Sequence, residues 1–96
     1  MAGLDGVTIG RIVWFVFDQS SADDVARYRE TVMSGRQETG NTVMVGDIYP
    51  AMIVRIFGGT TINLKVMLDG TDTYWATSVP YSDAKGLRTW HWPDRA

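Results

Sequence analysis

The side chains best suited to chemistry in this chain are aromatic and cationic, and its only histidine lies among them. The segment Trp90-His91-Trp92-Pro93 places two indoles on either side of His91 near the end of the chain. Hydrolytic and transfer reactions need a general base beside a nucleophile, or clustered metal ligands. A single histidine restricts both options, and the chain has no HExxH, GxSxG or glycine-rich phosphate-loop motif. We therefore predict no enzyme, no catalytic residue, no metal and no cofactor.

Two pairs of carboxylates are the remaining candidates for acid–base work. Asp23 and Asp24 suit the beginning of a helix, where the backbone amides favour negative charge, and Asp69 with Asp72 suits a turn. Both pairs thus have a structural explanation. Because the chain contains no cysteine, thiol nucleophiles, disulfides and thiolate metal sites are excluded as well.

Aromatic residues recur beside isolated cations and small polar groups. Indole and phenol rings offer faces on which bases stack, cationic groups pair with phosphate, and amides and hydroxyls bond to base edges. This composition is typical of a pocket for a flat, anionic ligand such as a nucleotide. The alternative is that the tryptophans, with His91 packed between two of them, belong to the core. The candidate ligand-binding residues are Arg11, Trp14, Arg55, Asn63, Lys65, Trp75, Thr77, Ser78, Tyr81, Arg88, Trp90 and His91.

Length and charge limit the classes of protein that fit. A chain of 96 residues forms one domain, 1–96, and buries only about 60–65% of its extended surface, which favours a homo-oligomer. A net charge of −2 argues against duplex nucleic acid as a partner. The N-terminal residues lack the pattern of a signal peptide, and no apolar run is long enough to cross a membrane. We expect a protein of the reducing cytoplasm with no membrane partner.

The elements that must position these side chains are mostly strands. Runs rich in β-branched and aromatic residues predict strands over 9–17, 48–57, 62–68, 74–79 and 89–92, and a further short strand over 42–45. In 62–68 the apolar side chains alternate with polar ones, which indicates one core face. In 74–79 the same period places Trp75, Thr77 and Val79 on one side of the strand.

One helix is predicted between the first two strands. Ser20 and Ser21 occupy the capping position, and Val25, Tyr28 and Val32 fall at helical spacing on one face, so the helix covers about 21–34. The chain is therefore predicted to be mainly β (β-rich α+β), with a small bent antiparallel sheet or SH3-like barrel and one inserted short helix.

Several phrases of the sequence, in order, resemble a family of small bacteriophage and prophage proteins. They are Gly10-Arg11-Ile12-Val13, Pro50-Ala51-Met52-Ile53-Val54-Arg55, Ile62-Asn63-Leu64-Lys65-Val66, Asp69-Gly70, Trp75-Ala76-Thr77-Ser78-Val79-Pro80-Tyr81-Ser82 and Thr89-Trp90-His91-Trp92-Pro93. The chain is similar to the sponge proteins of the anti-CBASS type, which hold cyclic dinucleotide defence signals in oligomer pockets without cleaving them. The resemblance implies a phage-encoded immune-evasion protein of the host cytoplasm. The segment 20–41 is longer than in the shorter forms of that family, which leaves the ligand and the assembly open.

Two other functions fit the same residues. The first is an SH3-like protein-interaction or virion-associated module that binds a peptide or host protein through its aromatics. The second is an enzyme that cleaves a nucleotide with His91 as acid or base. The placement of charge separates the sponge from the peptide module, since an anion pocket needs cations that converge on the indoles.

Overall fold

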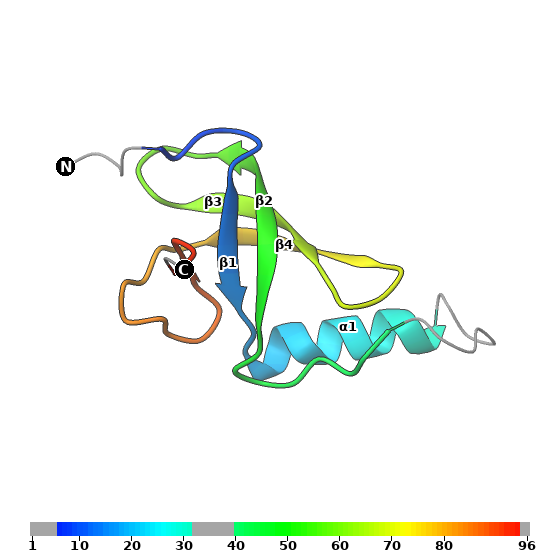
Figure 1. Cartoon of the computed structure of the whole chain (residues 1–96). Helices are drawn as coiled ribbons and strands as arrows, with labels where there is room; N and C mark the ends of the chain where they lie inside the picture. The colour runs from blue at the N-terminus through cyan, green and yellow to red at the C-terminus, as the bar shows by residue number, and fades with distance from the viewer. Residues whose placement is uncertain (1–5, 32–39, 95–96) are drawn as a thin grey trace.

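The computed structural model describes residues 6–31 and 40–94, and within them the fold is mainly β, as predicted. Five of the predicted strands and the predicted helix are present, with limits that differ by a few residues, whereas residues 42–45 form no strand, so that prediction was wrong. The elements are β1 (Ile12–Val16), α1 (Gln19–Thr31), β2 (Ile48–Ile56), β3 (Ile62–Met67), β4 (Thr73–Val79) and β5 (Trp90–His91) (Figure 1). No helix in the described ranges is long and apolar enough to span a bilayer.

The strands form one bent antiparallel sheet in the order β4-β3-β2-β1-β5. In Figure 1, β1 and β2 cross in front of β3 and β4. The chain just after β4 then meets the far side of β5, because the Trp90 amide donates to the Pro80 carbonyl (3.0 Å) and the Ser82 amide donates to the Trp90 carbonyl (3.0 Å). These two bonds close the sheet on itself in the manner of a small barrel.

The core fills the inside of this bent sheet. The alternation predicted for β3 is confirmed, since Ile62, Leu64 and Val66 are fully buried and Lys65 is exposed. The buried apolar residues also include Val13, Phe15, Phe17, Ala51, Ile53, Ala76, Val79 and Trp90. The paired strands β1 and β2 thus turn alternate side chains inward, as the period of two requires.

A bulge in β4 changes which of its side chains face the core. The register shifts from Leu64↔Ala76 to Ile62↔Val79, and Ser78 adopts a positive φ of 50° at the extra position. The Asn63 side-chain oxygen accepts a hydrogen bond from the Ser78 amide at 2.7 Å. Trp75 and Val79 therefore lie on opposite faces, and the prediction that they share one side was wrong.

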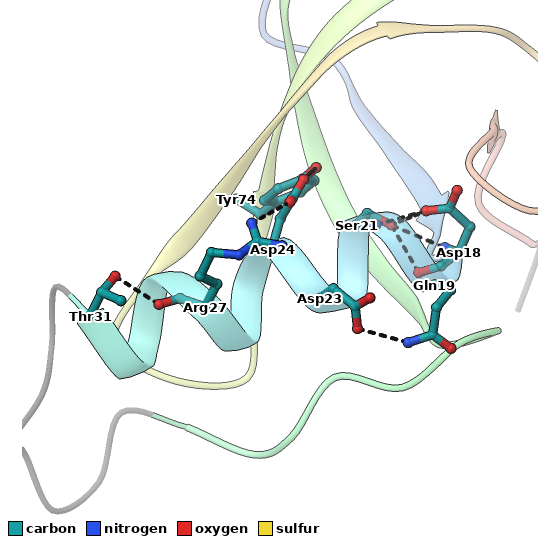
Figure 2. A network of polar contacts seen from close by, with 8 residues as sticks. All are labelled: Asp18, Gln19, Ser21, Asp23, Asp24, Arg27, Thr31 and Tyr74. Atoms are coloured by element: carbon teal, nitrogen blue, oxygen red, sulfur yellow. Dashed lines mark hydrogen bonds and ion pairs between the residues drawn. The ribbon is translucent and has the colours of Figure 1, made fainter.

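The helix begins earlier than the sequence indicated. Asp18 caps it: the Ser21 amide donates to the Asp18 carboxylate (2.9 Å), and the Asp18 amide donates to the Ser21 hydroxyl (3.0 Å) (Figure 2). This reciprocal pair satisfies amides at the helix start. Val25 is buried as expected, but Tyr28 is 47% exposed, so its assignment to the packed face was wrong. Residues 32–34 of the predicted helix lie outside the described residues.

An ion pair fixes α1 against the turn between β3 and β4. The Arg29 guanidinium donates to both carboxylate oxygens of Asp72 at 2.8 and 3.0 Å, and to the Asn41 carbonyl at 2.8 Å. Both side chains of the pair are nearly buried. The bond from Arg29 is the main reason that the pKa of Asp72 lies below its usual value. The pair sets the distance between the helix and β4.

Candidate ligand-binding cleft

A cleft of about 670 Å³ lies between α1 and the β3–β4 hairpin. The helix supplies one wall, and the two strands supply the other. Arg88, from the segment before β5, lines the cleft together with the strand residues. The lining residues are Asp24, Val25, Arg27, Tyr28, Thr31, Lys65, Asp72, Thr73, Tyr74, Trp75, Thr77 and Arg88.

The indole of Trp75 is the most exposed aromatic surface at the cleft. It is 60% exposed, and Trp75 pairs directly with Lys65 across the β3–β4 ladder. Side chains on directly paired residues of antiparallel strands are close neighbours. The register therefore fixes a cation beside an open indole. Tyr28 and Tyr74 add two further rings to the lining.

Lys65 and Arg88 supply positive charge to the cleft. Lys65 forms no ion pair with any residue in the described ranges. Arg88 adopts a positive φ of 56°, and its guanidinium donates to the Thr77 carbonyl at 3.1 Å. A guanidinium has five N–H donors, so this bond leaves other donors for a ligand.

The two carboxylates that line the cleft are already paired. Asp24 accepts a hydrogen bond from Arg27 (3.0 Å) and another from the Tyr74 hydroxyl (3.0 Å) (Figure 2). Burial, followed by the bond to Asp24, raises the pKa of Tyr74 to about 12, so this phenol stays a donor at neutral pH. Asp72 is held by Arg29. The charged groups of the cleft that form no ion pair with a carboxylate among the described residues are therefore the cations Lys65 and Arg88.

Four of the twelve candidate residues from the sequence meet at this cleft, namely Lys65, Trp75, Thr77 and Arg88. Two predicted phosphate ligands lie elsewhere. The Arg11 guanidinium lies 4.9 Å from the ring centre of Trp92, and the Arg55 guanidinium lies 5.4 Å from that of Phe57. Neither arginine lines the cleft.

Four further candidates take part in packing or in backbone hydrogen bonds of the barrel. Trp90 is fully buried, its indole N–H donates to the Thr60 carbonyl (2.8 Å), and its ring packs at 4.9 Å against Tyr81. Asn63 and Ser78 hold the bulge in β4. These positions place the four residues in the framework of the barrel and not in the lining of the cleft.

His91 is buried against the edge of Trp14, with ring centres 6.0 Å apart. Neither imidazole nitrogen has a hydrogen-bond partner among the described residues. Burial, followed by the charge of Lys85, lowers the pKa of His91 below its usual value. The neutral ring therefore packs as an apolar group, and His91 does not line the cleft.

The sequence did not indicate the residues that α1 contributes. Tyr28, Arg27 and Thr31 line the cleft, but they are more than 30 positions from Lys65. The helix is held near β4 by contacts between distant positions, namely the Arg29–Asp72 pair, 43 residues apart, and the Tyr74–Asp24 hydrogen bond, 50 residues apart. The one signal in the sequence was Tyr28 itself, a large aromatic residue that was placed with Val25 on the packed face of the helix.

No group of three or more histidine, cysteine, aspartate or glutamate side chains placed to hold a metal ion occurs in the described part of the chain. No protein-family model matches the chain, and no curated protein or solved structure was found to match it.

Proposed function

We propose that the cleft binds a cyclic dinucleotide and that the protein is a phage-encoded immune-evasion factor, which sequesters this defence signal in the host cytoplasm without cleaving it. The observation that carries the proposal is the open indole of Trp75, which is paired with Lys65 across the ladder and shares the cleft lining with Arg88. Stacking on an indole tolerates any base, and the two cations suit phosphates. The resemblance to phage sponge proteins supplies the class of ligand.

The affinity that a sponge needs can be compared with what this lining offers. A nanomolar complex requires about 12 kcal/mol of binding free energy. Stacking of two bases contributes about 2–6 kcal/mol, and each hydrogen bond to a charged group adds about 1.5–3 kcal/mol. With one such bond each from Lys65 and Arg88, the total is about 5–12 kcal/mol, which reaches the required value only at its upper limit. Enclosure by a second subunit supplies the remainder, so the proposal includes a homo-oligomer.

Binding without cleavage is supported by the location of the groups that could act as acid or base. The only histidine is buried outside the lining, and Asp24 and Asp72 are engaged by arginines. The hydrogen bond from Arg29 lowers the pKa of Asp72, so this carboxylate is a weak base.

The alternative, a peptide-binding or virion-associated module, ranks second because of the same charges. A groove for a proline-rich peptide needs aromatic residues without converging cations, whereas Trp75 lies beside Lys65 and shares its cleft with Arg88. The two functions make different predictions in a single binding screen.

Isothermal titration calorimetry against cyclic mono-, di- and trinucleotides and a proline-rich peptide tests the proposal. We expect a cyclic dinucleotide to bind and Lys65→Ala to weaken its affinity about tenfold or more. Arg55→Ala is the matched control, since it removes an exposed cation outside the cleft, and it should bind like the unaltered protein. The ligand should be recovered intact after denaturation. Binding of the peptide alone, or recovery of a cleaved nucleotide, would contradict the proposal.

A further inference from the structure

The polar groups of the cleft are divided between its two walls. The cations Lys65 and Arg88 belong to β3 and to the segment before β5. Asp24 belongs to α1, which forms the other wall. The proposed function assigns the phosphates of the ligand to the two cations. Because a carboxylate repels a phosphate, Asp24 should face a different part of the ligand.

Asp24 has acceptor atoms that a ligand can reach. Its side chain is 42% exposed, whereas Asp72, the other carboxylate of the lining, is 5% exposed and binds Arg29 through both oxygens. Arg27 donates to Oδ1 of Asp24 (3.0 Å), and the Tyr74 hydroxyl donates to Oδ2 (3.0 Å) (Figure 2). A carboxylate oxygen can accept about two hydrogen bonds, so each oxygen keeps one acceptor position for a ligand. The two existing bonds hold the carboxylate in one orientation.

The nucleobases differ in what they offer to such a carboxylate. A carboxylate only accepts hydrogen bonds, so it binds best to two donors that lie side by side. Guanine presents a ring N–H and an amino group next to each other on its Watson–Crick edge. In adenine and cytosine the amino group lies beside a ring nitrogen that carries a lone pair, and uracil presents one N–H between two carbonyls. Guanine is therefore the base whose edge can donate to both oxygens of Asp24 without opposing a lone pair.

We propose that Asp24 is a specificity-determining residue of the cleft and that it selects guanine. The inference rests on the proposed function and adds the identity of the base to it. A guanine that stacks on the open Trp75 indole donates through its edge to Asp24, and the phosphates pair with Lys65 and Arg88.

Isothermal titration calorimetry with cyclic di-GMP and cyclic di-AMP tests this selection. We expect cyclic di-GMP to bind about 5- to 150-fold more tightly, which is the discrimination given by one bidentate contact to a base. Asp24→Asn replaces one acceptor oxygen by an amino group that donates, but it can still accept a bond from Tyr74. This variant should bind cyclic di-GMP more weakly, bind cyclic di-AMP no more weakly than the unaltered protein, and so lose most of the preference.

Asp23→Asn is the matched control for this variant. Asp23 is the neighbouring carboxylate on α1, it accepts a hydrogen bond from Gln19 (2.8 Å), and it lies outside the lining of the cleft. The control removes the same charge from the same helix, and it should keep the preference for cyclic di-GMP.

A second measurement uses the unaltered protein and does not depend on the folding of any variant. Cyclic di-IMP carries hypoxanthine, which keeps the ring N–H of guanine but lacks the amino group. It should bind at least about fivefold more weakly than cyclic di-GMP, because one oxygen of Asp24 loses its donor.

The outcomes separate this inference from the proposed function. Equal affinity for cyclic di-GMP and either of the other two ligands, tighter binding of cyclic di-AMP, or a preference that Asp24→Asn retains would overturn the inference, while binding of cyclic dinucleotides would still stand. Absence of binding by all three ligands would overturn the proposed function, and the inference with it.

Discussion

Replacement of Trp90 by alanine should destabilise the barrel more than any change at an exposed tryptophan. The indole is fully buried, lies 4.9 Å from the Tyr81 ring and 5.1 Å from the Trp92 ring, and donates its N–H to the Thr60 carbonyl. Truncation of a buried tryptophan costs about 3–5 kcal/mol, because apolar contacts are lost and a cavity remains. Trp90 also belongs to β5, which closes the sheet.

This loss is a large fraction of the stability of a small domain, which is about 5–15 kcal/mol. For a chain of this size, each kcal/mol lowers the melting temperature by about 4–8 °C, so Trp90→Ala should melt at least about 12 °C lower. Circular dichroism during thermal and urea unfolding measures both quantities. Trp90→Phe keeps a ring but loses the bond to Thr60, and it should fall between the two proteins.

Trp75→Ala serves as the control for stability, because its indole is mostly exposed. That change should lower the free energy of unfolding by less than about 1 kcal/mol. If Trp90→Ala melted within a few degrees of the unaltered protein, or if Trp75→Ala were the less stable of the two, the assignment of Trp90 to the core would be refuted.

Three further changes follow from single contacts. The folded-state pKa of His91 lies below its unfolded value of 6.5, so the contribution of the neutral imidazole to stability is complete above pH 6.5, and the free energy of unfolding falls as the pH drops below 6.5. Urea unfolding between pH 7.5 and 5 should show this decrease, and His91→Leu should remove it. Arg29→Met should cost about 3–5 kcal/mol, because it leaves the Asp72 carboxylate nearly buried and unpaired, and adding Asp72→Asn should restore part of that loss; equal stability of the single and double variants would contradict the buried pair. Asn63→Ala should cost about 1–3 kcal/mol and speed hydrogen exchange of the Ser78 amide, which unchanged exchange would disprove.

The sequence predicted the strands well because their signals are local. The alternation of β3 lies within a few residues, and the structure has the β2–β3 hairpin where the predicted strands 48–57 and 62–68 follow each other. The helix was also placed between the correct strands. Its start was set two residues too late, because Asp18 and Ser21 cap it as a reciprocal pair in which Asp18 takes the position assigned to a serine.

The faces of β4 and the composition of the cleft depend on tertiary contacts. A strict period of two cannot reveal the bulge at Ser78, because the bulge forms only when Asn63 of the neighbouring strand bonds to its amide. The approach of α1 to β4 rests on an ion pair between distant positions. Lys65 and Trp75 were recognised by residue type. Tyr28 was placed on the packed face of the helix and Arg55 in the site, because the sequence does not show these tertiary contacts.

Titration of Trp75→Ala with the cyclic dinucleotide that binds the unaltered protein tests the central claim most directly, with its melting temperature recorded alongside. Since stacking on an aromatic ring contributes about 1–3 kcal/mol per base, affinity should fall about 5- to 150-fold while the fold persists. Unchanged affinity in a folded Trp75→Ala protein would show that the ligand does not rest on this indole, and the account of the cleft would then be wrong.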